Sequence, residues 1–202
     1  MSIFRLIIWN FLTVIILFII SDFIYTKIFE KKYRIPHSIY HHTLLPNFKG
    51  VDSWGDLNYE ICTDEHGFKI SCKQEKPSGD TFELAFIGDS FTEAIGMPYE
   101  DSFVGMFSKK HSNLKIANLG VSTYSPSIYL SKVQHLINSE LNFTHVVVFI
   151  DLSDIQNDSI LYEIDGNNVV RYRKNSKEYK NQLKQKQNKK KLINRMKQYI
   201  KD

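Results

Sequence analysis

The sequence predicts an α/β protein built on a parallel β-sheet and preceded by an N-terminal transmembrane helix. A long apolar segment opens the chain and supports the helix. Three short apolar runs then alternate with segments of helical periodicity, which is the pattern of right-handed βαβ units. Each apolar run ends at a glycine or an aspartate, so the strands would deliver polar residues to one edge of the sheet.

The composition excludes several classes of protein. The 202 residues include 26 Lys and Arg, 22 Asp and Glu and 43% hydrophobic residues, which is too apolar for a chain disordered throughout. Two cysteines are too few for a disulfide-rich scaffold or a cysteine-based zinc framework. The formal charge of +4 is uneven, because residues 171–202 carry 13 basic residues against two acidic ones. A mildly acidic body therefore precedes a strongly basic C-terminal segment.

Residues 1–25 are interpreted as a transmembrane anchor. No charge lies between Arg5 and Asp22, and the apolar run of about 18–20 residues is close to the length that spans a bilayer. Residues 3–25 are the expected contact with lipid. A cleavable signal peptide is disfavoured, because the small residues of a cleavage site do not follow the apolar run. Basic residues after the anchor favour a cytoplasmic body. The motifs that follow the predicted strands favour a periplasmic or other extracytoplasmic body, so the orientation stays open.

Residues 26–79 form the predicted juxtamembrane connector. Its prolines disfavour helix and give it an extended character. The neighbouring His41 and His42 have no accompanying metal-binding motif, so we expect no metal and no other cofactor.

A β-hairpin is predicted inside this connector, over residues 58–72 with its turn at 64–67. Cys62 and Cys72 flank the turn, at positions that could lie within disulfide range. In an exported compartment the two would be able to form a disulfide, and in the cytosol they would remain thiols.

The predicted α/β domain covers residues 80–172. We expect strands at 82–87, 114–119 and 144–150, helices at 98–111 and 125–138, and a hairpin at 160–172. The strands are near-continuous apolar runs, as expected when both faces of a sheet are covered.

Residues 173–202 form a predicted basic helical tail. Such a segment is either a solvated helix or a contact for anionic lipid or nucleic acid. No nucleic-acid-binding motif is present, so we expect no nucleic-acid partner.

Polar residues follow each predicted strand. Gly88-Asp89-Ser90 comes after the first, Gly120 after the second and Asp151-Leu152-Ser153-Asp154 after the third. A serine at a strand-to-helix turn is exposed near backbone N–H groups and the positive end of the helix dipole. A neighbouring base would make Ser90 a nucleophile, whereas without one the same tripeptide is ordinary turn and helix-capping chemistry.

Taken in order, these segments resemble the blocks of the SGNH/GDSL hydrolases. FIGDSFT (86–92) looks like the first block, IANLGV (116–121) is similar to the second, and VVVFIDLSD (146–154) occupies the position of the third. The resemblance implies a three-layer α/β/α, flavodoxin-like fold. It also implies ester hydrolysis or acyl transfer on acylated carbohydrate or lipid, including that of the cell envelope. Ser90 would be the nucleophile, and the N–H groups of Ser90 and Gly120 would stabilise the oxyanion.

Two features depart from that family. Ser153 stands where the family has an asparagine that donates to the oxyanion, and Asn157 is a further candidate donor. The family's C-terminal Asp-x-x-His is absent, and His66 is the remaining candidate base. We therefore expect an incomplete sheet, and a membrane-anchored hydrolase or acyltransferase that is inactive as this chain and shortened before its base. The alternative is a non-catalytic binding or accessory module that keeps the fold.

Overall fold

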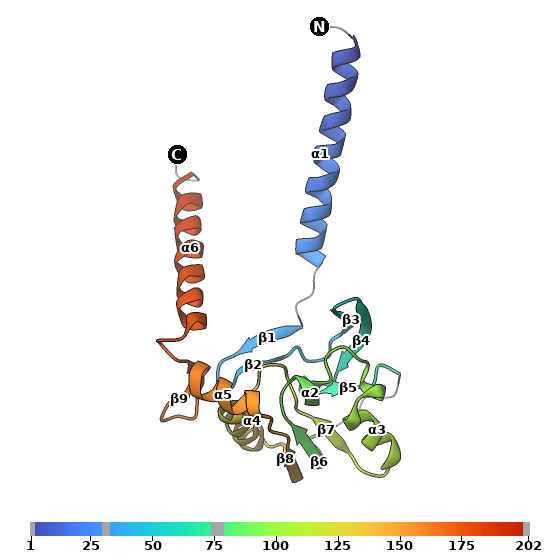
Figure 1. The fold of residues 1–202 in the computed structure, drawn as a ribbon, viewed down its shortest axis with the longest axis vertical. Coiled ribbons are helices and arrows are strands. Elements are labelled where there is room, and N and C mark those ends of the chain that lie inside the picture. Colours follow the sequence, from blue (N-terminus) through green and yellow to red (C-terminus); the bar gives the residue numbers. More distant parts are fainter. Residues whose placement is uncertain (1–2, 30–32, 74–78, 200–202) are drawn as a thin grey trace. The chain divides into compact units, whose positions relative to one another are not determined.

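The computed structural model describes residues 3–29, 33–73 and 79–199 (Figure 1). The chain forms two compact units, residues 1–33 and 34–202. The first consists of helix α1 (Ile3–Phe29). No helix within the described ranges combines the length and the apolar character that crossing a membrane requires, so the transmembrane helix predicted over residues 1–25 is not confirmed.

The segment after α1 forms two small antiparallel sheets. One pairs β1 (Arg34–His37) with β2 (His41–Leu44), and the other has the order β3-β4-β5, formed by Lys49–Trp54, Leu57–Thr63 and Lys69–Ile70. The sequence predicted only the hairpin of β4 and β5, which the structure confirms. Its turn is fixed by Asp64, whose Oδ1 accepts hydrogen bonds from two backbone N–H groups at 2.9 and 2.8 Å.

Cys62 and Cys72 form a disulfide across this hairpin, with Cα atoms 5.2 Å apart. Cys62 lies one residue before the end of β4, opposite Ile70 of β5, and is buried. The disulfide therefore closes the β4–β5 hairpin at the end away from its turn.

The structure confirms the predicted parallel β-sheet, which has three strands. Its strands have the order β7-β6-β8, with β6 (Thr81–Ile87) between β7 (Ile116–Asn118) and β8 (Asn142–Val148). Strand β7 is buried along its whole length, and β6 is buried at its carboxyl end. The other edge strand, β8, has no buried residue, so it is less covered than its apolar sequence predicts. Val148, for example, is 47% exposed.

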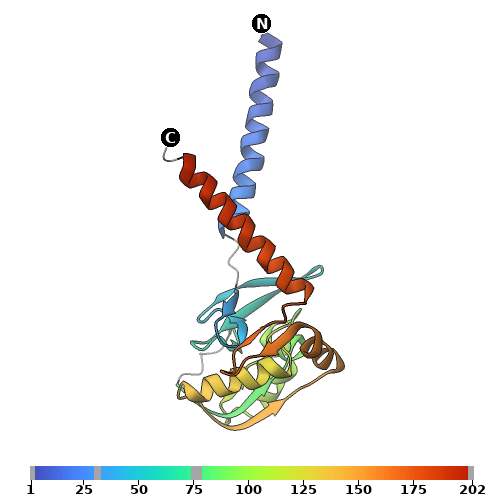
Figure 2. The same cartoon turned by 90° about the vertical axis from the view of Figure 1, so that its left-hand side faces the viewer.

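Helices flank the sheet. The first predicted helix is the 3₁₀ turn η1 (Tyr99–Asp101) followed by α3 (Phe103–Lys110), and the second is α4 (Pro126–Asn138). Tyr99 and Val104 from the first pack on Phe86 and Ile116 of the sheet. Helix α4 packs against β8 and the segments that follow it, and Figure 2 shows it alongside the parallel strands.

The last part of the chain contains one helix that the sequence analysis missed. Helix α5 (Leu152–Leu161) begins at Asp151, which forms a capping box with Asp154. The predicted hairpin follows as β9 (Tyr162–Ile164) and β10 (Val170–Tyr172), and the predicted basic tail is helix α6 (Lys177–Tyr199).

Candidate active site

The three parallel strands bring their carboxyl ends together. The N–H of Val121 donates to the carbonyl of Gly88 at 3.3 Å, and the N–H of Phe149 donates to the carbonyl of Ile87 at 2.8 Å. The segments that follow β6, β7 and β8 therefore begin side by side. This is the edge at which ligands bind in open parallel sheets.

Ser90 lies at this edge, directly after the central strand. It is the first residue of α2 (Ser90–Glu93) and is partly exposed. Its Oγ donates to Oδ2 of Asp89 at 3.0 Å, while Oδ1 of Asp89 accepts the N–H of Phe91 at 3.0 Å. Because α2 has only four residues, its dipole at Ser90 is small.

Gly120 lies directly against the turn that carries Ser90. A Cβ at this position would come within 2.6 Å of the Glu93 nitrogen and 2.7 Å of the Thr92 carbonyl carbon, so only glycine allows the approach. The N–H of Gly120 donates to Oδ1 of Asn118 at 3.0 Å, and Nδ2 of Asn118 donates to the carbonyl of Thr92 at 2.9 Å. The predicted oxyanion donor is thus close to the turn but hydrogen-bonded inside the protein.

Ser153 is likewise occupied by a neighbour. Its Oγ donates to Oδ1 of Asp151 at 2.6 Å and its N–H donates to the same oxygen at 2.5 Å. These bonds lower the pKa of the Asp151 carboxyl. Ser153 is exposed at the start of α5, so in this structure it serves helix capping.

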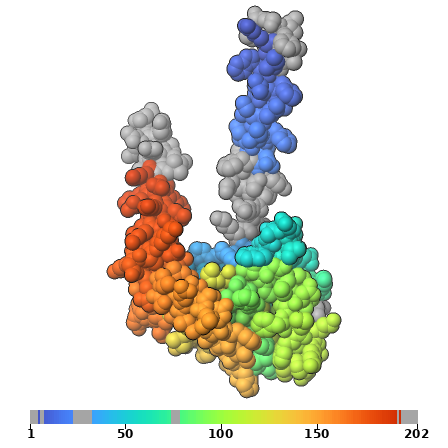
Figure 3. Space-filling model, in the orientation of Figure 1, coloured from blue at the N-terminus to red at the C-terminus, as the bar shows by residue number. Residues whose placement is uncertain are grey.

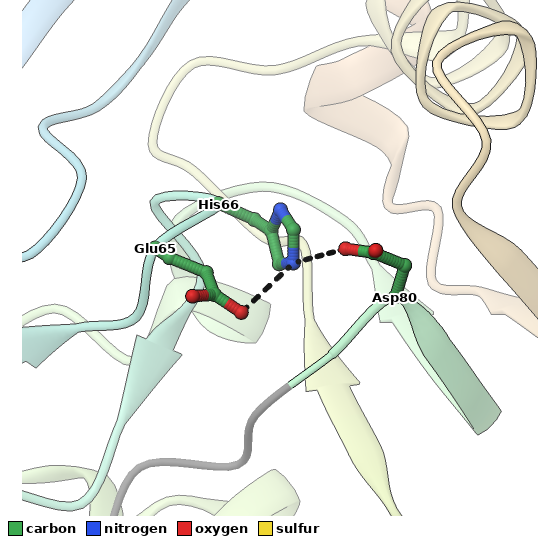
Figure 4. A group of neighbouring side chains, drawn as sticks. All are labelled: Glu65, His66 and Asp80. Atoms are coloured by element: carbon green, nitrogen blue, oxygen red, sulfur yellow. Dashed lines mark ion pairs between the residues drawn. The ribbon is translucent and has the colours of Figure 1, made fainter.

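His66 does not lie near Ser90. Figure 4 shows its ring between two carboxylates, with Nε2 3.7 Å from Oε1 of Glu65 and 3.2 Å from Oδ1 of Asp80. Asp80 immediately precedes β6, whereas Ser90 follows the opposite end of that strand, which spans about 20 Å over seven residues. The structure therefore excludes His66 as the base for Ser90.

The same group of residues has the spacing of metal ligands. One ligand atom from each of Glu65, His66 and Asp80 lies within 4.8 Å of the other two. The two carboxylates are 51% and 61% exposed, and exposed acidic groups often cluster without binding a metal.

Comparisons with known protein families, with curated proteins and with solved structures found no match. The assignment of a function therefore depends on the residues of this chain and their geometry.

A buried glutamate links the Ser90 turn to the loop after β7. Glu93 is fully buried, pairs with Arg34 of β1 and accepts the N–H of Ser122 at 2.5 Å. Burial raises the pKa of the Glu93 carboxyl, while Arg34 favours its charged form. This residue fixes the position of Ser90 relative to the segment that contains Gly120.

A buried lysine supports the other end of α2. Nζ of Lys69 donates to the carbonyls of Ala94 and Met97 at 2.8 and 2.9 Å. Burial lowers the pKa of Lys69 to about 8. The left-handed conformation of Ala94, at φ 60°, ends the helix at this point.

His42 also reaches this region, although the sequence analysis considered it only as a metal ligand. Its Nε2 lies 2.8 Å from the carbonyl oxygen of Ser122 and 3.2 Å from Oγ1 of Thr123. Burial lowers the pKa of His42 to about 4, so the imidazole is neutral near pH 7. No local signal placed β2 beside this loop, because the two are about 80 residues apart in the chain.

Proposed function

We propose that this chain carries a serine-centred site for ester hydrolysis or acyl transfer, with Ser90 as the nucleophile. The supporting observation is the position of Ser90, partly exposed at the carboxyl end of the central strand and hydrogen-bonded to a carboxylate. The close packing of Gly120 on the same turn agrees with the order of motifs in the SGNH/GDSL hydrolases. That resemblance supports an acylated carbohydrate or lipid as substrate, and a three-layer, flavodoxin-like arrangement of the domain.

The chemistry follows from the contacts of Ser90. Its Oγ would attack the ester carbonyl and transfer its proton to the Asp89 carboxylate, which already accepts that hydrogen bond. The ester's alkoxide would leave with the proton that Asp89 accepted. Water or a second alcohol would then take the acyl group from the serine and give up a proton, through Asp89, to Oγ of Ser90.

We expect this reaction to be slow. The N–H of Gly120 and the hydroxyl of Ser153 are both bonded within the protein, and the loss of one oxyanion donor costs about 10²–10³ in rate. Among the described residues, the site also lacks the imidazole base that the resemblance to the SGNH/GDSL hydrolases implies. Formation of the acyl-serine is therefore a better test than turnover.

The experiment is to incubate the chain with p-nitrophenyl acetate and to locate acetyl groups by peptide mass spectrometry. Acetyl-Ser90 should form, and Ser90→Ala should abolish both this adduct and the release of p-nitrophenol above background. Ser112→Ala, at an exposed serine after α3, is the matched control and should leave both unchanged. Equal p-nitrophenol release by the wild type and Ser90→Ala would exclude Ser90 as the nucleophile.

A non-catalytic binding or accessory module is the second candidate. The internal hydrogen bonds of Gly120 and Ser153 favour it, because they leave these two groups engaged with protein rather than with substrate. A folded protein that forms no acetyl-Ser90 would support this candidate.

We also propose that residues 34–202 function in an oxidising, extracytoplasmic compartment. The support is the disulfide between Cys62 and Cys72, since such bonds persist outside the reducing cytosol. Alkylation of the protein isolated from its cells, before and after reduction, would show whether the thiols are bonded there.

A further inference from the structure

A cavity of about 670 Å³ lies between the β1–β2 hairpin, β10 and the first turns of α6. In Figure 3 the blue β1–β2 segment lies beside the orange segment that leads into α6. The volume is that of a site for a small molecule. The polar side chains that matter for its chemistry are Arg34, His41, His42, Arg171, Lys174 and Lys186.

The wall of this cavity is held by contacts between segments far apart in the sequence. The N–H of Val170 donates to the carbonyl of Ile39 at 2.8 Å, which ties β10 to the β1–β2 turn. The ring of His41 packs edge-on against Tyr172, with ring centroids 4.3 Å apart, and against Tyr162 at 5.1 Å. The cavity wall is therefore built by the fold rather than by one mobile loop.

Basic side chains outnumber acidic ones in the lining of the cavity. Four basic side chains line it against a single acid, Glu163. Arg34 pairs with Glu93, and Arg171 lies 3.3 Å from Asp165. Lys174 and Lys186 form no ion pair with any residue that the structure describes, so both charges remain available to a ligand.

Two neutral imidazoles also line the cavity, because burial lowers the pKa values of His41 and His42 to about 4. Nδ1 of one lies 2.7 Å from Nδ1 of the other. Nε2 of His42 is engaged with the Ser122 carbonyl, so Nε2 of His41 is the imidazole nitrogen left for a ligand. Tyr172 and Tyr179 add aromatic surface to the lining. Lysines suit an anionic group, whereas Nε2 of His41 and the tyrosines suit the hydroxyl groups and ring faces of a sugar.

We propose that this cavity binds an anionic sugar, held through its phosphate or carboxylate by Lys174 and Lys186. The inference does not depend on a catalytic Ser90, because it rests on a different set of residues. Since His42 both lines the cavity and contacts the carbonyl of Ser122, a bound sugar would lie next to the loop that follows β7.

The test is isothermal titration calorimetry of the full chain with four probes: glucose 6-phosphate, glucuronate, glucose and inorganic phosphate. We expect binding of at least one anionic sugar, weaker binding of inorganic phosphate and no detectable binding of glucose. Comparison of the phosphate and carboxylate sugars identifies the anion. Failure of both anionic sugars to bind, or equal binding of glucose, would overturn the proposal.

The variant that tests the site is Lys174→Gln/Lys186→Gln. It should weaken binding of the anionic sugar about 10- to 100-fold, since it removes two charged donors. The matched control is Lys184→Gln/Lys190→Gln, which removes the same charge from exposed positions of α6 outside the cavity. Equal weakening by the two double variants would show general attraction to a basic helix and would contradict a built site.

Discussion

The disulfide between Cys62 and Cys72 should contribute measurably to the stability of residues 34–202. It joins residues that are 10 positions apart in the sequence and closes the β4–β5 hairpin. The entropy lost by the unfolded chain when a loop of this size is closed corresponds to about 2.8 kcal/mol at 25 °C. For a domain of this size, that is a decrease of about 6–11 °C in melting temperature when the bond is removed.

The assay is urea unfolding followed by circular dichroism, with and without reductant. Reduction should lower the free energy of unfolding by about 2.8 kcal/mol, and Cys62→Ser/Cys72→Ser should reproduce the decrease. Reductant should have no effect on the double variant, which controls for effects on the rest of the molecule. An unfolding transition that reductant leaves unchanged in the wild type would refute the reasoning.

Three further perturbations follow from the buried residues around Ser90. Glu93→Gln should lower the free energy of unfolding by about 3 kcal/mol, because Arg34 loses its buried partner. The control Glu60→Gln, at an exposed position, should change it by less than about 0.5 kcal/mol. Urea unfolding measures both variants. Gly120→Ala should cost about 1–3 kcal/mol in the same measurement because its Cβ would meet backbone atoms of α2, and the control Gly166→Ala, with no atom within 4 Å, should be nearly neutral. Burial lowers the pKa of Lys132 to about 7 from 10.5, so the unfolded chain binds more protons between these values and stability should rise with pH from about 7 towards 10. Lys132→Met should flatten this rise, and an unchanged slope would contradict the assignment.

The sequence predicts the parallel sheet well because its signals are local. Each strand is a short apolar run that ends at a turn residue, and the helices between them show regular periodicity. The β1–β2 pair and strand β3 were missed although both belong to local hairpins, with residues 38–40 joining β1 to β2 and residues 55–56 joining β3 to β4. Their short strands are largely polar and lack the apolar alternation that indicates a strand. Helix α5 did have a local signal, the capping pair Asp151 and Asp154. It was missed because these residues were interpreted as part of the third hydrolase motif rather than as the start of a helix.

The residues proposed for the site gather at one edge of the sheet, but their hydrogen bonds differ from those that the motifs implied. Gly120 lies against the Ser90 turn, which agrees with the order of the motifs. Its N–H, however, donates to Oδ1 of Asn118, a local hydrogen bond that asparagine often accepts from the residue two positions later. The pairing of Glu93 with Arg34 could not be predicted, since the two residues are 59 positions apart. Long-range ion pairs of this kind have no local sequence pattern.

The central claim is that Ser90 is a nucleophile, and labelling with a fluorophosphonate probe tests it most directly. The probe forms a covalent bond with an activated serine and releases fluoride, so it requires no turnover. The account predicts a label on the peptide that contains Ser90, and none on that peptide in Ser90→Ala. A folded protein with no label at Ser90, or with label that Ser90→Ala leaves unchanged, would contradict it.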